Sequence, residues 1–166
     1  MLFTKAYSLF AITILVLFQL FAQTALAKET IGWVEFVSIY PGNLQLKAKM
    51  DSGAKTSSLH CDCQNIYKKN GKQWIKFTVK NENGQLITLE RKVIRMVKIK
   101  RHFGEAQRRA VIRLGVCLAN TYKEIEVNII DRSGLNYQML IGRNYLAGDF
   151  LIDTGSTFTS KPKCKK

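Results

Sequence analysis

Asp51-Ser52-Gly53-Ala54 is the stretch that decides the fold, together with Leu140-Ile141-Gly142-Arg143-Asn144 well downstream of it. An Asp-Ser-Gly triplet sets a carboxylate on a tight loop beside a hydroxyl. The second stretch reads as a strand that ends at a glycine turn and enters a short helix. Asp-Ser-Gly alone is common in proteins, so the prediction depends on the two stretches occurring together and in this order.

The sequence around these stretches predicts an all-β domain, because short alternating runs are separated by Gly and Asn turns. Residues 44–50 alternate apolar and polar side chains, so this strand has one buried face and leads into Asp51. A loop is expected over 101–109, and a short helix over 143–147. Further strands are expected over 31–38, 58–67, 73–80, 85–100, 110–117, 123–131, 137–141 and 149–153.

Residues 1–27 form a separate segment. Lys5 carries their one charge, an apolar run extends from Ala6 to about Ala22, and Ala25-Leu26-Ala27 precedes Lys28. This layout predicts a secretory signal peptide, with an uncleaved membrane anchor as the alternative because the apolar run is long. We therefore expect a protein exported to the periplasm or secreted, with one domain over 28–160 and a frayed basic tail over 161–166.

The chain is strongly basic, with 26 Lys and Arg residues against 12 Asp and Glu residues and a formal net charge of +14. Such an excess attracts anionic partners over long distances. Acidic peptides, anionic envelope polymers and lipid headgroups fit an exported chain, and nucleic acid is not expected as a partner. The alternative is an ordinary solvated basic surface.

The four cysteines are Cys61, Cys63, Cys117 and Cys164, and export would permit disulfides. Residues two apart on a strand are too far apart for good disulfide geometry, which disfavours a Cys61–Cys63 pair. A link from the Cys61/Cys63 segment to Cys117 or Cys164 is expected, and the sequence does not assign it.

The chain resembles the retropepsin-like aspartic proteases. It is most similar to the bacterial branch that carries the label ATP-dependent zinc protease. The similarity covers about 31–154 and is carried by residues 49–60, Arg108-Arg109, Asp131-Arg132-Ser133 and residues 139–148. It implies a closed antiparallel barrel with one short C-terminal helix, and an exported peptidase that hydrolyses peptide bonds without a cofactor.

The resemblance implies that Asp51 is the catalytic residue. Aspartic proteolysis uses two carboxylates that share one proton around an attacking water, since two charges so close cannot both ionise. A chain of this size supplies one such loop, which implies a homodimer with the site on its two-fold axis. Ser52 would brace the two loops, Gly53 would let them approach, and Ala54 completes the loop.

Two further residues of the resemblance support this loop, and one adds a substrate contact. Gly142 would pack under the loop where a Cβ would intrude, and Arg143 would tie the loop to the helix. Retroviral relatives offer this arginine an acidic residue, but Lys55 and Thr56 stand there in this chain. Lys55 is instead a candidate for contact with a carboxylate on an acidic peptide substrate.

Two other motifs have weaker interpretations. Asn81-Glu82-Asn83-Gly84 predicts a hairpin that sits where a flap should be, although its tip is polar. Asp153-Thr154-Gly155 reads as a second triplet, but too little chain follows it for a second lobe, and we expect no catalysis from Asp153.

Two alternatives remain open from the sequence. One is a non-catalytic envelope-binding module on the same fold. The other is a zinc-dependent peptidase, with His60, Cys61, Cys63, His102 or Asp51 as the candidate ligands. The chain contains no His-Glu-x-x-His or Cys-x-x-Cys sequence, so no metal site is expected.

Overall fold

The computed structural model describes residues 27–61, 65–99 and 106–164. The strands are β1 (Glu29–Tyr40), β2 (Leu44–Met50), β3 (Ser57–His60), β4 (Asn65–Lys69), β5 (Lys72–Lys80), β6 (Leu86–Lys92), β7 (Arg95–Ile99), β8 (Gln107–Leu118), β9 (Thr121–Ile130), β10 (Met139–Ile141) and β11 (Phe150–Thr157). The helix α2 spans Arg143–Leu146. The expected signal segment lies outside the described residues except for Ala27. No helix in the described ranges is long and apolar enough to cross a membrane.

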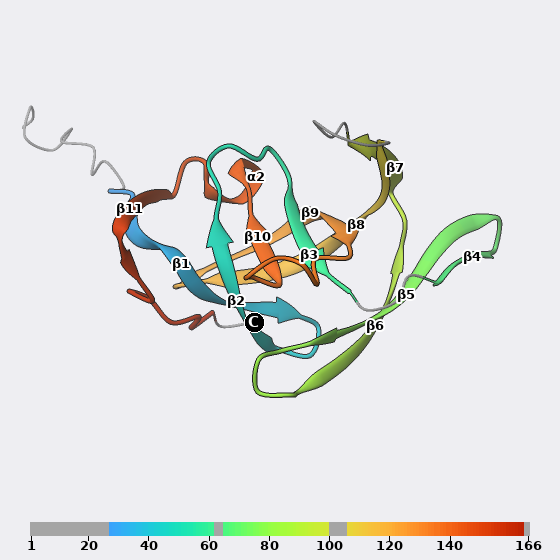
Figure 1. Ribbon diagram of the computed structural model, residues 1–166, viewed down its shortest axis with the longest axis horizontal. Coiled ribbons are helices and arrows are strands. Elements are labelled where there is room, and N and C mark those ends of the chain that lie inside the picture. The colour runs from blue at the N-terminus through green and yellow to red at the C-terminus, as the bar shows by residue number, and fades with distance from the viewer. Residues whose placement is uncertain (1–26, 62–64, 100–105, 165–166) are drawn as a thin grey trace, which may run out of the picture.

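Six of the described strands close into a barrel in the order β1–β2–β10–β3–β9–β8, with β8 pairing back onto β1. The expected closed barrel with a short C-terminal helix is confirmed (Figure 1). Two of its pairings, β2 with β10 and β3 with β9, are parallel, so the barrel is mixed and not antiparallel throughout. Strand β11 extends the sheet outside the ring by pairing in parallel with β1.

The expected alternation of β2 is present, with every second residue buried from Leu44 to Met50. These side chains join the apolar faces of β8 and β9 in one core. Because successive side chains of a strand point to opposite faces, the buried face also fixes the register that delivers the chain to Asp51.

The boundaries of several strands differ from the expected ones. The strand expected over 58–67 is two strands, β3 in the barrel and β4 in a separate sheet with β5 and β6. The strand expected over 85–100 breaks where Val93 bonds Gln73 of the small sheet and Ile94 bonds Val111 of the barrel. The loop expected over 101–109 already belongs to β8 from Gln107 onward.

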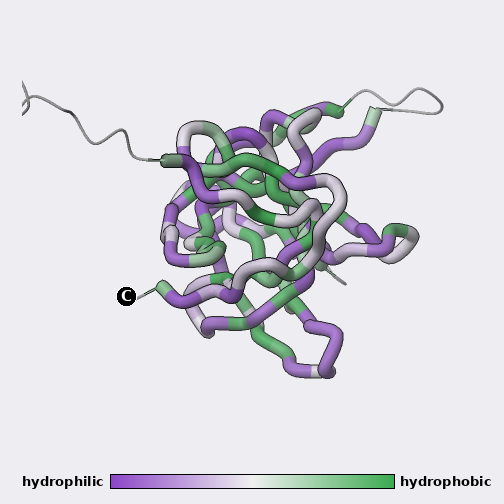
Figure 2. Tube along the Cα trace, turned by 90° about the vertical axis from the view of Figure 1, so that its left-hand side faces the viewer, coloured by the Kyte–Doolittle hydropathy of each residue, from purple (hydrophilic) through white to green (hydrophobic). Residues whose placement is uncertain are grey.

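The hairpin at Asn81–Gly84 joins β5 to β6 as expected, but it lies away from the Asp51 loop. Figure 1 shows this turn at the bottom of the molecule and the β2–β3 loop at the top. The Glu82 carboxylate accepts the Lys47 N–H at 3.1 Å, which fixes the tip against the middle of β2. Figure 2 shows the turn as hydrophilic. This hairpin is therefore not placed to act as a flap over Asp51.

The segment after β11 is attached to the barrel, so the expectation of fraying from Lys161 is wrong for residues 161–164. Cys164 forms a disulfide with Cys117 on β8, and the Lys163 N–H donates to Ala119 O at 2.7 Å. The expected link from the Cys61/Cys63 segment to either of these cysteines is therefore wrong. Cys61 is buried, and Cys63 lies outside the described residues.

Glu35 holds the start of this C-terminal segment from within β1. Its fully buried carboxylate accepts hydrogen bonds from the N–H groups of Gly32, Thr159 and Ser160. It also accepts the hydroxyl groups of Thr159 and Ser160. Burial alone raises the pKa of the Glu35 carboxyl, but these hydrogen bonds, led by the Thr159 hydroxyl, outweigh it and leave the pKa lowered.

Candidate active site

Asp51 lies at the end of β2, where its N–H donates to Ile141 O at 2.8 Å. Its carboxylate turns back onto its own loop, and Oδ1 accepts the N–H groups of Gly53 at 2.9 Å and Ala54 at 3.2 Å. A carboxylate offers about four acceptor sites, so these two bonds orient the group and leave capacity for a water or a substrate. Asp51 is half-buried, which keeps it within reach of solvent.

The loop after Asp51 is bonded directly to the start of α2. The N–H of Arg143 donates to Ala54 O and the N–H of Asn144 donates to Lys55 O, both at 2.9 Å. The first N–H groups of a helix have no partner within the helix, so the loop carbonyls satisfy them. The side chain of Lys55 lies at the surface.

Gly142 is the position where the two stretches come closest. A Cβ there would lie 2.8 Å from the carbonyl carbon of Thr56, closer than real side chains come, and 3.0 Å from Ala54 O. The Gly142 N–H donates to Ser57 Oγ at 3.0 Å, which holds the junction in this close approach. A residue without a side chain lets the loop rest directly on the β10–α2 junction.

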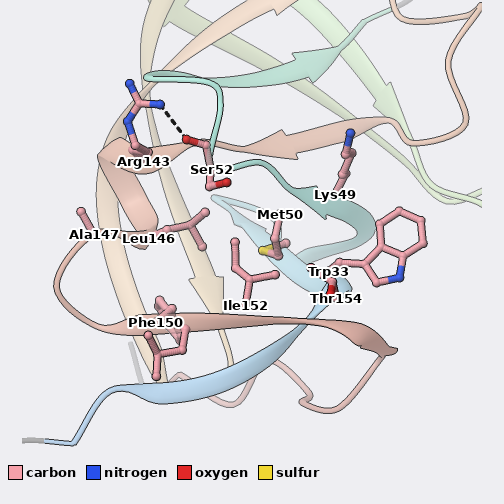
Figure 3. Close-up of a pocket in the computed structure, with 11 residues that line it drawn as sticks. Trp33, Lys49, Met50, Ser52, Arg143, Leu146, Ala147, Phe150, Ile152 and Thr154 are labelled. Carbon is pink, nitrogen blue, oxygen red and sulfur yellow. Dashed lines mark hydrogen bonds between the residues drawn. The ribbon is translucent and has the colours of Figure 1, made fainter.

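Arg143 reaches over the loop from α2. Its Nη1 donates to Ser52 O at 2.6 Å and to Gly53 O at 2.9 Å, and Figure 3 shows the bond to Ser52. Two carbonyl oxygens therefore receive this arginine, in place of the acidic residue found in retroviral relatives. The guanidinium fixes the backbone on both sides of the Ser52–Gly53 peptide.

Ser57 and Asn144 form a second tie that the sequence did not single out. Asn144 Oδ1 accepts both the N–H and the hydroxyl of the buried Ser57, and its Nδ2 donates to Glu126 O at 2.9 Å. Both residues stand in the quoted motif segments, and this was the only indication in the sequence that they belong to the site. Their pairing depends on β3 and α2 meeting in space.

Arg132 is a functional candidate that stands in a quoted motif but received no role from the sequence. Its Nη1 donates to Ser58 Oγ at 2.9 Å and its Nε to Tyr137 O at 3.1 Å. Burial lowers the pKa of Arg132, the positive charge of Arg109 lowers it further, and the charge of Asp51 opposes both. Arg132 therefore lies within electrostatic range of the candidate catalytic carboxylate.

An apolar groove borders the loop. It has a volume of about 690 Å³ and lies between the loop, β1, α2 and β11, with Ser52 and Arg143 at one side and Trp33 and Ile152 at another (Figure 3). Leu151 of β11 also lines it and is 53% exposed. The groove thus combines uncovered apolar surface with two residues of the candidate site.

Asp153 is not part of this loop arrangement. It lies on β11 opposite Gly32 of β1, and its carboxylate accepts the Ser156 hydroxyl and the Gly155 N–H. These bonds, the hydroxyl first, lower the pKa of Asp153. Its carboxylate is thus hydrogen-bonded within its own strand.

The zinc candidates do not form a site within the described residues, where no group of three His, Cys, Asp or Glu side chains is placed to hold a metal. His60 Nδ1 accepts the Arg132 N–H at 2.8 Å and lies 3.7 Å from Asp131 Oδ1. Cys63 and His102 lie outside the described residues.

Comparison with known proteins places this chain in a family. Residues 30–163 match the RimB-like family model, described as "Retropepsin-like aspartic endopeptidase RimB". Two curated relatives, each named "Probable alpha-L-glutamate ligase", come from Shewanella pealeana (31% identical) and Shewanella halifaxensis (32% identical). The matches cover 76% of this chain but 28% of each relative, so the chain spans less than a third of their length.

A solved structure gives an independent comparison of the fold. A Legionella pneumophila protein of unknown function superposes with a TM-score of 0.69 and is 31% identical in sequence. The match covers 81% of this chain and 100% of that chain.

Proposed function

The chain belongs to the RimB-like family of retropepsin-like aspartic endopeptidases, and on that premise we propose that it is a peptidase in which Asp51 activates water. The observation that carries the proposal is the fixed Asp51 loop. Its carboxylate is oriented by Gly53 and Ala54, and its backbone is held by Arg143. A carboxylate held in this way is pre-organised for general acid–base catalysis.

The proposed reaction needs two such carboxylates, one from each subunit of a homodimer. One ionised Asp51 takes a proton from a water, whose oxygen bonds to the peptide carbonyl carbon. The protonated Asp51 of the other subunit stabilises the developing oxyanion. Transfer of a proton to the amide nitrogen then breaks the C–N bond and releases a carboxylate and an amine.

The surface around the loop supports a dimer. Ser52 and Arg143 border the 690 Å³ groove, and exposed Leu151 extends its apolar lining. Contiguous apolar surface of this kind beside a site is typical of a protein interface. A second copy covering it would bring the two Asp51 loops together on the two-fold axis.

We propose acidic peptides as the substrates, and glutamate-rich peptides first. The net charge of +14 favours acidic chains by long-range attraction. The relatives that share this domain carry a name for an enzyme that joins glutamate, and its product would be an acidic peptide. We also propose that the protein is exported to the periplasm or secreted, because residues 1–27 have the layout of a signal peptide. Its positive charge would then favour peripheral contact with an anionic envelope.

The test compares wild type with Asp51→Asn on a fluorogenic glutamate-rich peptide, with Asp153→Asn as the matched control. We expect Asp51→Asn to abolish cleavage and Asp153→Asn to leave it unchanged. Specific activity should rise with enzyme concentration as the dimer forms. Full activity of Asp51→Asn, or of a strict monomer, would refute the aspartic mechanism.

Two further arms separate the alternatives. A zinc-dependent peptidase would lose activity with a chelator and keep it with a pepstatin-type inhibitor. A binding module would bind the peptide equally well as wild type and as Asp51→Asn, and neither protein would cleave it.

A further inference from the structure

A second cavity lies close to the Asp51 loop, beside β2 and β10. It has a volume of about 350 Å³ and is lined by residues that include Trp33, Lys49, Arg132, Tyr137 and Leu140. Lys49 precedes Asp51 by two residues and pairs with Leu140 in the parallel β2–β10 ladder. Trp33 and Lys49 also line the apolar groove, so the pocket and the groove meet at these two residues.

Two positively charged side chains, Arg132 and Lys49, line the pocket. Arg132 is held rigidly, because Nη1 and Nε donate to neutral oxygens of Ser58 and Tyr137. Within the described residues, neither Arg132 nor Lys49 forms a salt bridge with a carboxylate. A half-buried arginine without a salt bridge to a described carboxylate has lost part of its hydration and gains from a carboxylate brought by a ligand.

The other walls suit the methylene groups of an acidic side chain. The Trp33 and Tyr137 rings meet edge to face with centroids 5.9 Å apart, which holds both rings in place. Leu140 adds apolar surface from β10. Apolar walls around a few fixed charges are the usual construction of a site selective for a small charged group.

We propose that this pocket binds the side-chain carboxylate of an acidic substrate residue close to the cleaved bond, with Arg132 as the main specificity-determining residue and Lys49 as its second cation. This inference rests on the proposed function and deepens it, since it assigns the acidic preference to a defined site. It also moves that preference from Lys55, the candidate from the sequence, to the Arg132 pocket. Planar guanidinium groups pair with carboxylates through two parallel hydrogen bonds, which lysine cannot reproduce.

The experiment uses the full chain and two peptides of equal length, one with glutamate and one with isosteric glutamine at the same positions. Wild type should prefer the glutamate peptide in kcat/KM by roughly 10-fold to 100-fold, the range of one to two charge-assisted bonds. Arg132→Gln should remove most of this preference, mainly by raising KM for the glutamate peptide. Lys49→Gln should reduce it by a smaller factor.

Matched controls separate the pocket from general charge. Lys76→Gln, on an exposed position of β5, removes the same charge and should keep the preference. Retention of the preference in Arg132→Gln, or its loss in Lys55→Gln or Lys76→Gln, would overturn the proposal. If Arg132→Gln fails to fold, Arg132→Lys replaces it in the test. This variant keeps the positive charge but loses the planar guanidinium, so it should show only part of the wild-type preference for the glutamate peptide.

A binding measurement distinguishes failure of this inference from failure of the proposed function. Fluorescence anisotropy of both labelled peptides with Asp51→Asn requires no catalysis. Tighter binding of the glutamate peptide, lost in the Asp51→Asn/Arg132→Gln double variant, would support the pocket even if wild type cleaves neither peptide. Equal binding of the two peptides by Asp51→Asn would overturn it.

Discussion

Gly142 shows how one missing side chain decides whether the candidate site can form. The loop backbone at Ala54 and Thr56 occupies the space that a Cβ would need. Since the contacts are with backbone atoms, no rotamer change relieves them, and the loop itself has to move. That movement would also separate Arg143 from the Ser52 and Gly53 carbonyls.

We therefore predict that Gly142→Ala lowers the free energy of unfolding by about 1–3 kcal/mol and reduces peptidase activity by more than the loss of folded protein explains. Gly134→Ala is the matched control, because a Cβ at Gly134 would meet no atom within 4 Å apart from its own residue and its two chain neighbours. Denaturant titration and kcat/KM measure the two effects. Wild-type activity in a stable Gly142→Ala protein would contradict this account of the loop.

Glu35 is the second residue with a testable effect, because its contribution to the stability of the fold should depend on pH. Its hydrogen bonds lower the pKa of its carboxyl in the folded protein below the usual 4.5. A lowered folded pKa stabilises the native state at pH values above the unfolded pKa, and that contribution is lost as pH falls through the folded pKa.

At neutral pH we predict that Glu35→Gln lowers the free energy of unfolding by about 1–3 kcal/mol, because an amide group cannot accept all of these bonds. The difference from wild type should shrink as the pH falls below about 4.5. Glu124→Gln, at an exposed position of β9, is the control. A difference that stays constant from neutral to acid pH would show that the carboxylate charge is unimportant.

At the scale of single residues, the sequence predicted the residues of the loop but not their neighbours. Asp51, Gly142 and Arg143 stand in short motifs whose local pattern is readable. Arg132 and Glu35 were not readable as a pocket cation and a buried anchor, because their partners are distant in sequence. Arg132 bonds Ser58 from 74 residues away, and Glu35 bonds Thr159 from 124 residues away.

Among the elements, the β5–β6 hairpin is the one whose assigned role changed. Asn81 organises its turn, because its Oδ1 accepts the N–H groups of Asn83 and Gln85 and its Nδ2 donates to Gln85. Only 3% of Asn81 is exposed, so the side chain is a structural part of the turn.

Asn81→Ala should therefore lower the free energy of unfolding by about 1–2 kcal/mol and leave kcat/KM unchanged. Asn83→Ala, which changes an exposed residue of the same turn, should alter neither quantity. A drop in kcat/KM for folded Asn81→Ala would restore the hairpin as a candidate flap.

The elements themselves were predictable where the pattern is local, as in the alternation of β2 and the turn at Asn81–Gly84. The parallel pairings of β2 with β10 and of β3 with β9 were not, because each joins strands that lie far apart along the chain. The break at Val93–Ile94 could not be predicted from the sequence either, because the residues on its two sides form one continuous extended run. The run pairs with the small sheet at Val93 and with the barrel at Ile94.

For the whole molecule, the Cys117–Cys164 disulfide joins the C-terminal segment to the barrel across 47 residues of sequence. Closing a loop of this size restricts the unfolded chain and stabilises the fold by about 2–4 kcal/mol. We predict that reductant lowers the melting temperature of wild type, while Cys164→Ser starts at the lower value and does not respond. Equal melting temperatures for wild type with and without reductant would contradict this prediction.

The position of β10 also sets when the candidate site can first form during synthesis of the chain. Strands β2 and β3 flank β10 and are joined by the Asp51 loop, so the loop spans a gap until Met139–Ile141 fills it. Two groups outside the loop that hold it, the Ile141 carbonyl and the Arg143 side chain, lie at the end of β10 and the start of α2. A growing chain therefore carries Asp51 long before the residues that hold its loop have been made, and the proposed peptidase activity requires both.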